Sequence, residues 1–403
     1  MPILTNYHHF DGRHWETGSV ANFLAYRGVR APHTGQPYSE ALLMGVSGGA
    51  TMGYFTFAYE GYDPTARILT RNTFDPWLTM LSRLGVAQNV QHTAKPEAAV
   101  RNLLTALEEG TPALVWADVW LLPYNGLAFD DGMWAMFPVL VYGYDADAAV
   151  VRIADRARVG LTATTDDLAR ARGRAKNNKH RLITLEAPDP AKLPAAVTAG
   201  IWDCLRLYTE PPPRGSVHNF GLAAYRRWAE ALAKPKSRGS WEREFPAGLK
   251  LLSGLTSAYG DIALFGKGTN DFADRHRQAD FLDEAAVILG RPGLGAAADG
   301  FRAAAGLWGD LARALLPDDV APLRETRELM VRRHEAFLDR GNDALMEMQA
   351  IDARLDAIRA AVAADFPLSP AEVEAFRARL ADGVMAIHDT EAAAVEALRA
   401  AMT

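Results

Sequence analysis

An abrupt change from a polar loop to an apolar helix near the start of the chain constrains the fold most. Residues 10–19 (Phe-Asp-Gly-Arg-His-Trp-Glu-Thr-Gly-Ser) mix glycine with charged and polar side chains, whereas residues 20–28 (Val-Ala-Asn-Phe-Leu-Ala-Tyr-Arg-Gly) are largely apolar. A helix that is apolar on most sides has to be buried. The pattern therefore predicts a buried helix over Ser19–Tyr26, whose positive dipole end faces the preceding loop.

Composition excludes several classes of protein. The length of 403 residues exceeds what one hydrophobic core usually supports, so two domains are expected. A formal net charge of -6 disfavours a nucleic-acid partner. No apolar run is long enough to span a bilayer, and the N-terminus has no signal-peptide pattern, so no membrane partner is expected. The single cysteine, Cys204, rules out an internal disulfide. We expect a cytoplasmic protein without a metal or another cofactor.

The first half of the chain alternates helical and strand-like patterns. Helices are expected over residues 41–46, 75–84 and 96–109, and strands over residues 111–120, 137–145, 149–155 and 180–186. Residues 139–142 (Val-Leu-Val-Tyr) form a continuous apolar run, as in a strand that is covered on both faces. Helices followed by an antiparallel sheet predict the α+β class.

The second half looks entirely helical. Three consecutive prolines at 211–213 mark the best domain boundary, so the expected domains are residues 1–210 and 211–403. Helices are expected over residues 221–233, 246–259, 271–289, 294–316 and 345–362, with a last helix that begins at the capping box Ser369-Pro-Ala-Glu372. We expect the last two helices to form an antiparallel hairpin. Their apolar stripes fit packing within the domain or, alternatively, a homodimer.

Several short motifs occur in a fixed order along the chain. They lie at residues 12–17 (Gly-Arg-His-Trp-Glu-Thr), 39–49, 118–124, 141–145 and 153–155 in the first half, and at 221–229, 266–272 and 281–286 in the second. The first set resembles the N-terminal domain of the butirosin biosynthesis protein H family. The second set resembles the helical domain of unknown function that commonly follows it. Together the motifs extend over most of the chain.

The resemblance implies a papain-like N-terminal fold and the transfer of an aminoacyl group from an acyl carrier protein to an aminoglycoside amine. In that scheme a cysteine forms a thioester, a histidine activates the cysteine, and an aspartate orients the histidine. The matching positions in this chain are Trp15, Phe137 and Asp155, so only the aspartate is present.

The standard cysteine–histidine mechanism is therefore not expected. No histidine occurs between residues 93 and 179, the interval that holds the central sheet, so a shifted alignment does not supply one. Cys204 lies on an apolar helix near the domain boundary, where a lone cysteine usually behaves as a small hydrophobe. Thiolate catalysis needs both a sulfur and a neighbouring base.

Other polar residues remain at the expected cleft. The candidate catalytic residues are His14, Glu16 and Asp155, with His14 as a general base. The alternative is that His14 caps the helix and that Glu16 interacts with the helix dipole. The candidate substrate-binding residues are Trp15, Ser47, Asp118, Tyr124 and Phe137. Trp15 either forms an aromatic wall, together with Trp116, Trp120 and Trp134, or simply fills the site as part of the core.

Two functions follow from these residues. The first is an enzyme of specialised metabolism that transfers or condenses a carrier-bound acyl or aminoacyl group onto an amine without a cysteine thioester. The second is a catalytically inactive relative that binds a metabolite or a biosynthetic partner. The partners considered are a small-molecule amine or acyl substrate and an acyl carrier protein, which the basic residues Arg170, Arg172 and Arg174 would contact. Direct packing of Trp15 against Phe137 would favour the second function.

Overall fold

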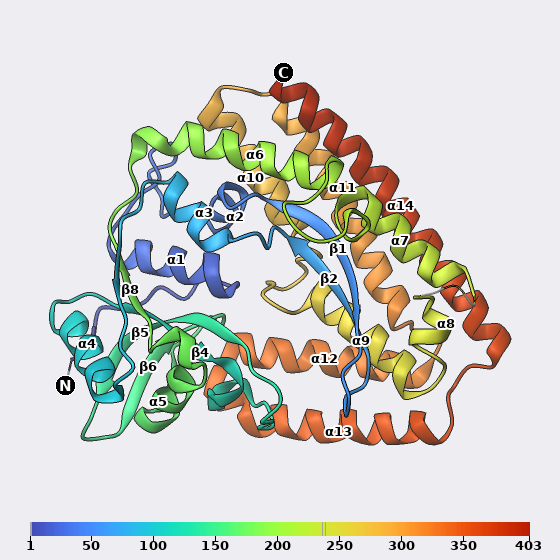
Figure 1. Ribbon diagram of the computed structural model, residues 1–403, viewed down its shortest axis with the longest axis horizontal. Coiled ribbons are helices and arrows are strands. Elements are labelled where there is room, and N and C mark those ends of the chain that lie inside the picture. The colour runs from blue at the N-terminus through green and yellow to red at the C-terminus, as the bar shows by residue number, and fades with distance from the viewer. Residues whose placement is uncertain (1, 236, 238) are drawn as a thin grey trace. The chain divides into compact units, whose positions relative to one another are not determined.

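The computed structural model describes residues 2–235, 237 and 239–403, and it separates into two compact units (Figure 1). The sheet unit comprises Met1–Leu43, Leu81–Lys192 and Arg332–Ile351, and the helical unit comprises Met44–Met80, Leu193–Val331 and Asp352–Thr403. Each unit is thus assembled from three segments that are distant in the sequence.

The sheet unit is built on a six-stranded antiparallel sheet with the strand order β3-β8-β4-β5-β6-β7. The strands are β3 (Gln88–Gln91), β4 (Ala113–Asp118), β5 (Met136–Asp145), β6 (Val150–Ala154), β7 (Leu161–Thr164) and β8 (Leu182–Leu185). Val139, Leu140 and Val141 in β5 are fully buried, as the continuous apolar run predicted. The expected strands at 111–120, 137–145, 149–155 and 180–186 are therefore confirmed.

Helices pack on this sheet, and the first of them positions the candidate site. They are α1 (Trp15–Tyr26), α4 (Pro96–Glu108) and α5 (Thr165–Gly173). Helix α1 packs on β5, and eight of its residues, from Thr17 to Leu24, are buried. The helix begins earlier than the sequence suggested, at Trp15, because the polar residues 14–18 already form its cap and first turn.

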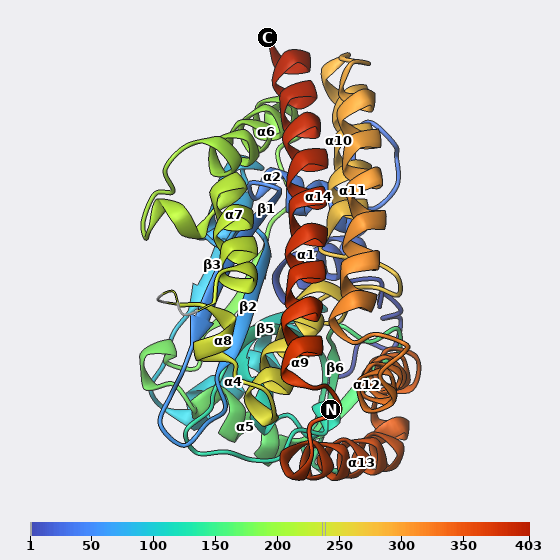
Figure 2. The same cartoon turned by 90° about the vertical axis from the view of Figure 1, so that its right-hand side faces the viewer.

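Four further helices contain a boundary between the units: α2 (Glu40–Val46), α3 (Pro76–Arg83), α12 (Ala321–Arg340) and α13 (Leu345–Ala364). The helical unit contains α6 (Leu193–Thr209), α7 (Gly221–Ala233), α8 (Trp241–Glu244), α9 (Leu249–Ala263), α10 (Arg275–Leu289), α11 (Leu294–Leu315) and α14 (Pro370–Met402). Helix α14 packs along α11 and α7 (Figure 2). No described residue after β8 lies in a strand, so the α+β class and the helical C-terminal region are confirmed.

The helical unit also holds a two-stranded antiparallel sheet, β1 (Ala50–Phe57) and β2 (Thr65–Arg71), which the sequence did not predict. Side chains of α9 bond to the outer edge of β2: the N–H groups of Ala66 and Ile68 donate to Ser257 and Asp261. The compact units therefore do not follow the boundary at 210/211. As a division into inherited domains, that boundary stays a prediction.

The predicted hairpin of the last two helices is wrong. Helix α13 instead runs antiparallel to the preceding helix α12, and ion pairs join Arg354 to Glu325 and Arg332 to Glu347. The apolar stripe of α14 already packs on α11 and α7, so it cannot also cover α13. The predicted start of α14 is confirmed, because Ser369 and Glu372 form a complete capping box.

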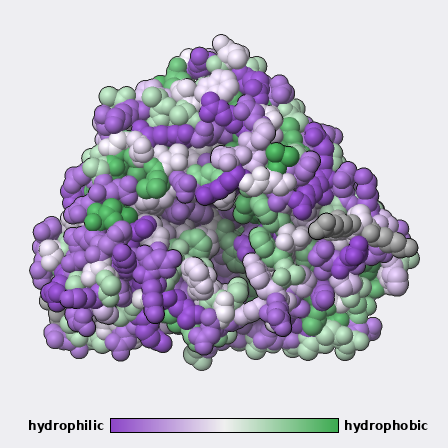
Figure 3. Space-filling model, viewed as in Figure 1, coloured by the Kyte–Doolittle hydropathy of each residue, from purple (hydrophilic) through white to green (hydrophobic). Residues whose placement is uncertain are grey.

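None of the described helices is long and apolar enough to cross a membrane. On the face shown in Figure 3, hydrophilic residues cover most of the surface, with smaller hydrophobic areas between them.

Candidate functional site

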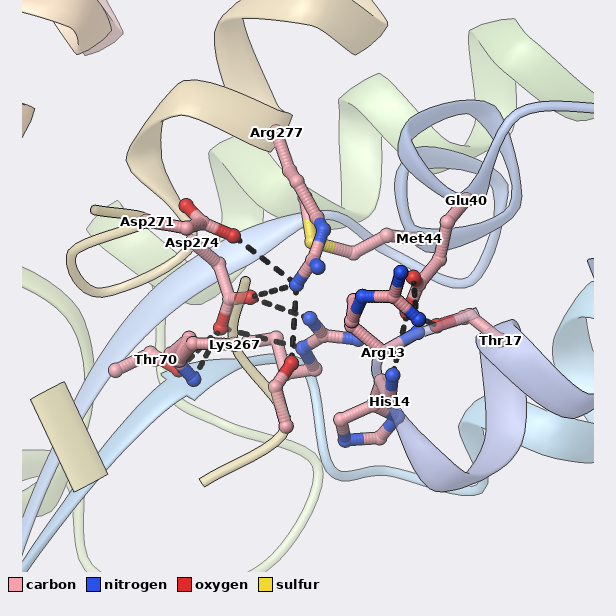
Figure 4. A network of polar contacts seen from close by, with 12 residues as sticks. Arg13, His14, Thr17, Glu40, Met44, Thr70, Lys267, Asp271, Asp274 and Arg277 are labelled. Carbon is pink, nitrogen blue, oxygen red and sulfur yellow. Dashed lines mark hydrogen bonds and ion pairs between the residues drawn. The ribbon is translucent and has the colours of Figure 1, made fainter. Parts of the chain in front are cut away.

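The start of α1 is held by a carboxylate from α2. The backbone N–H groups of Arg13 and His14 both donate to Glu40 at 2.8 Å, and the Thr17 hydroxyl donates to the same carboxylate at 2.9 Å (Figure 4). His14 is the N-cap residue, and its Nδ1 accepts a hydrogen bond from the N–H of Glu16 at 3.3 Å. The positive end of α1, where a thiolate enzyme would stabilise its sulfur, therefore already holds an anionic group.

The loop before α1 crosses closely over the first turn of the helix. A Cβ atom on Gly12 would lie 2.4 Å from the carbonyl oxygen of Gly18, so neither position tolerates a side chain. Asn22 accepts hydrogen bonds from the N–H groups of Asp11 and Gly12, at 3.2 and 3.1 Å. The glycines and the asparagine thus explain why this polar stretch folds tightly against a buried helix.

An aromatic stack occupies the two positions where the resemblance places the nucleophile and the base. Trp15 is the first residue of α1 and Phe137 lies near the start of β5; their rings are stacked, with centroids 4.5 Å apart and an interplanar angle of 18°. Both residues are half-buried. The indole N–H of Trp15 is buried and has no acceptor among the described residues. The positions that would form a catalytic pair are in contact, but only through aromatic faces.

Arg156 joins the stack from the end of β6. Its guanidinium carbon lies 4.5 Å from the centroid of the Trp15 ring and 4.9 Å from that of Phe337. It also forms an ion pair with Asp155 at 3.1 Å and donates a hydrogen bond to Asn125. A guanidinium over an aromatic face gains cation–π attraction, which is stronger where water is excluded.

Asp155 lies just beyond β6, is 4% exposed, and accepts a hydrogen bond from the hydroxyl of Tyr124 at 3.3 Å. Tyr124 lies in a short 3-10 helix, Pro123–Asn125, and is fully buried. Burial and the adjacent Asp155 hold the pKa of Tyr124 well above its usual value, so its hydroxyl remains a donor. The aspartate therefore bonds to a phenol and a guanidinium, where the resemblance expects it to orient a histidine.

Asp118 and Ser47 bond to the protein in other ways. Asp118, at the end of β4, is fully buried, accepts hydrogen bonds from the N–H groups of Trp120 and Ala135, and lies 3.6 Å from Arg174. Ser47 belongs to the helical unit, and its hydroxyl donates to the carbonyl of Met44 at 2.7 Å. The structure thus does not assemble all the candidate residues around Trp15.

The expected aromatic wall is reduced to one ring. Trp116 lies beneath the guanidinium of Arg181, 5.1 Å from its ring centroid, and Trp134 is 57% exposed. Phe137 is the ring that stacks on Trp15. The signals that sequence reasoning missed are Arg156, Asn125 and Phe337. Arg156 directly follows the candidate Asp155, whereas Phe337 comes from α12, for which no local pattern exists.

Cys204 is not a nucleophile at neutral pH. It lies in α6, is fully buried, and its Sγ donates to the carbonyl of Ala50 at 3.2 Å. Burial raises the pKa of its thiol to about 12, so the thiolate is essentially absent at pH 7.

The helical unit contains a separate cluster of buried charges centred on Asp274 (Figure 4). Asp274 pairs with Arg71, with Lys267 at 2.8 Å and with Arg277 at 3.1 Å. Burial alone would raise the pKa of Asp274, but these cations outweigh burial and hold it well below its usual range. Among the described residues, no group of three or more histidine, cysteine or acidic side chains is placed to hold a metal ion.

The fold and the site define the class of this protein: an α+β protein whose first helix begins at an aromatic residue stacked on the central sheet. The sequence model of the family described as Butirosin biosynthesis protein H, N-terminal, matches residues 14–156. The chain therefore carries the N-terminal domain of this family, as its motifs predicted, and the match ends at Arg156. No curated protein matches the chain.

Proposed function

We propose that residues 14–156 belong to a papain-like domain that has lost thioester chemistry and binds a small molecule or a partner protein in specialised-metabolite biosynthesis. The observation that carries the proposal is the stacking of Trp15 on Phe137 at 4.5 Å. Neither ring can attack a thioester or take up the proton of an attacking amine. The name of the matched family supports the biosynthetic context.

The surroundings of the stack suit a ligand that bears an acyl or amine group. Trp15 and Phe137 are half-buried, so part of each apolar ring is accessible, and the Arg156 guanidinium lies beside them. His14 and Glu16 are also half-buried and flank Trp15 in the chain. An apolar surface with a few polar groups at its margin is typical of small-molecule sites. A carrier protein that delivers the acyl group is the corresponding macromolecular partner.

Direct transfer from a carrier-bound acyl group to an amine, with His14 as the base, is the alternative. A base needs a free lone pair, but Nδ1 of His14 accepts the N–H of Glu16. In the neutral ring the proton then lies on Nε2, which makes that nitrogen a donor. The contacts of His14 thus favour the capping role over catalysis.

Restoring the lost residues tests the papain-like inheritance. In the double variant Trp15→Cys/Phe137→His, the new imidazole should activate the new thiol, so that iodoacetamide labels it faster than in Trp15→Cys alone. Intact-protein mass spectrometry measures the labelling. The wild-type protein is the control, because its buried Cys204 should stay unlabelled. Equal labelling of the single and double variants would contradict a retained catalytic geometry.

Turnover and binding assays test the function itself. Wild-type protein is incubated with acyl pantetheine thioesters, acyl carrier protein thioesters and primary amines. We expect no transfer above the protein-free control, and binding by calorimetry that weakens roughly tenfold or more in Trp15→Ala. Transfer by the wild type that is lost in His14→Ala would overturn the proposal in favour of direct aminolysis. The absence of both binding and transfer would also overturn it.

A further inference from the structure

A small cavity in the sheet unit lies next to a buried arginine. Its walls come from α4, α5, β5 and the turn before β8, and they are mostly carbon. The lining residues are Pro96, Ala99, Val100, Tyr144, Thr165, Leu168, Ala169, Arg172 and His180. The free space is close to that of one water-sized group.

Arg172 in α5 is the charged group that lines this cavity and is only 3% exposed. Its guanidinium donates to two backbone carbonyls, that of Ala99 at 3.3 Å and that of His180 at 2.9 Å. No described carboxylate forms an ion pair with it, and its Nε–H has no acceptor among the described residues. The charge is therefore buried without a counter-charge from the protein.

Such an arrangement is unusual, because a buried ion is ordinarily paired. Burial lowers the pKa of Arg172 to about 10, so the guanidinium is still charged at neutral pH. Carbonyl oxygens satisfy some of its N–H groups but supply no full negative charge. A positive charge, an N–H without an acceptor and an adjacent cavity together form an incomplete anion site.

We propose that this cavity binds one small monovalent anion, such as chloride or formate, paired with the guanidinium of Arg172. The limited space excludes larger anions such as gluconate. The Thr165 hydroxyl and the His180 ring line the same cavity and offer further polar groups.

Binding there would stabilise the C-terminal turn of α5 and the segment that precedes β8. Arg172 already joins α5 to the carbonyls of Ala99 in α4 and His180. Two residues further along, Arg174 pairs with the buried Asp118. The three arginines of the basic run thus differ: Arg170 is exposed and pairs with Asp167, whereas Arg172 is buried. A single solvated basic surface for a carrier protein does not exist at Arg172.

The test is anion-specific stabilisation of the full chain. The midpoint of thermal unfolding is measured in sodium chloride, bromide and formate against sodium gluconate at equal ionic strength. For the wild type we expect a saturable rise of roughly 2 °C with the small anions only. The rise should be absent in Arg172→Met and retained in Arg170→Met, the matched surface control on the same helix.

Crystals of the wild-type protein grown in bromide provide a second measurement that does not depend on the folding of a variant. An anomalous bromide peak beside the Arg172 guanidinium would support the proposal. A neutral water at that position in the presence of bromide would overturn it. So would a rise in gluconate equal to that in chloride, or the same rise in Arg172→Met. A response to halides without formate would keep the site and restrict it to monatomic anions.

Discussion

Two buried arginines, one in each unit, are stabilised in opposite ways. Arg275 in the helical unit pairs with Glu391 at 2.7 Å, and both side chains are completely buried. Burial alone would lower the pKa of Arg275, but Glu391 holds it well above its usual value. Arg172 in the sheet unit has carbonyl partners only, and burial lowers its pKa to about 10. A buried cation that the chain completes is a structural element, whereas one that the chain leaves incomplete is a candidate binding site.

Arg156, at the candidate site, lies between these extremes. It has a carboxylate partner in Asp155, yet its guanidinium faces the rings of Trp15 and Phe337. The family's catalytic positions have thus been replaced by groups that satisfy one another. Four predictions test this comparison.

Removing the partner of Arg275 should have the largest effect. Glu391→Ala leaves a buried guanidinium unpaired and removes the acceptor of Tyr208 and Trp308. We expect the free energy of unfolding to fall by about 3–5 kcal/mol, measured by urea denaturation. Asp283→Ala, which breaks an exposed pair with Arg302, is the control and should cost less than about 1 kcal/mol. Equal losses in the two variants would show that Arg275 does not depend on its partner.

Truncation of the stacked tryptophan should come next. Trp15→Ala removes the contacts of the ring with Phe137 and Arg156. Because the ring is half-buried, we expect a loss of about 2 kcal/mol, less than for a fully buried aromatic residue. Trp134→Ala removes a ring that is 57% exposed and should change the stability by less than about 0.5 kcal/mol. A negligible change in Trp15→Ala would mean that the stack is not a stable element, which would weaken the proposed function.

The helix caps offer a matched pair with smaller effects. Thr164 caps α5, which carries Arg172, and Ser369 caps α14, which carries Glu391; both form complete capping boxes. Alanine at either position should cost about 1 kcal/mol by urea denaturation. Similar losses would show that the two arginines differ because of their partners. A several-fold larger loss in one helix would place the difference in helix stability instead.

The acid response of the Asp274 cluster should be smallest, because two carboxylates oppose each other. Asp274 has a lowered pKa, so it contributes stability above its unfolded pKa, and that stability is lost as the pH falls through its folded pKa. Burial raises the pKa of Asp271, so its charged form is disfavoured near neutral pH and acidification relieves this cost.

Urea unfolding at pH 6 and pH 3 separates the two carboxylates. Asp274→Asn should reduce the loss of stability on acidification, whereas Asp271→Asn should increase it. The same response in both variants would contradict the opposite pKa shifts. The wild type, in which the two contributions partly cancel, is the reference for both.

The sequence predicted the elements that bury continuous apolar runs. Strands β4, β5 and β6 and the helices of the second half lie close to where the pattern placed them, because a covered strand and an amphipathic helix have distinct periods. The sheet β1–β2 was missed for a physical reason. Glycines at 45, 48, 49 and 53 suggested a loop, while the bonds that hold β2 come from Ser257 and Asp261, far along the chain.

The candidate site was predictable only in part. The motifs located Trp15 and Phe137, and the loss of cysteine and histidine was evident from the residues alone. The stack between the two rings was not, since α1 and β5 are separated by about 110 residues in the sequence. The role of Arg156 also depends on Phe337, which α12 supplies.

By itself the amino-acid sequence determined the α+β class, the family of residues 14–156 and the absence of the expected thiol and imidazole. Tertiary structure alone decided how the remaining charges are paired. A sequence lists carboxylates and guanidiniums but not which of them share a desolvated space, and that neighbourhood sets the free energy of a buried charge. Arg275 and Arg172 look alike in the sequence, and only the fold supplies one of them with Glu391 and leaves the other beside a cavity.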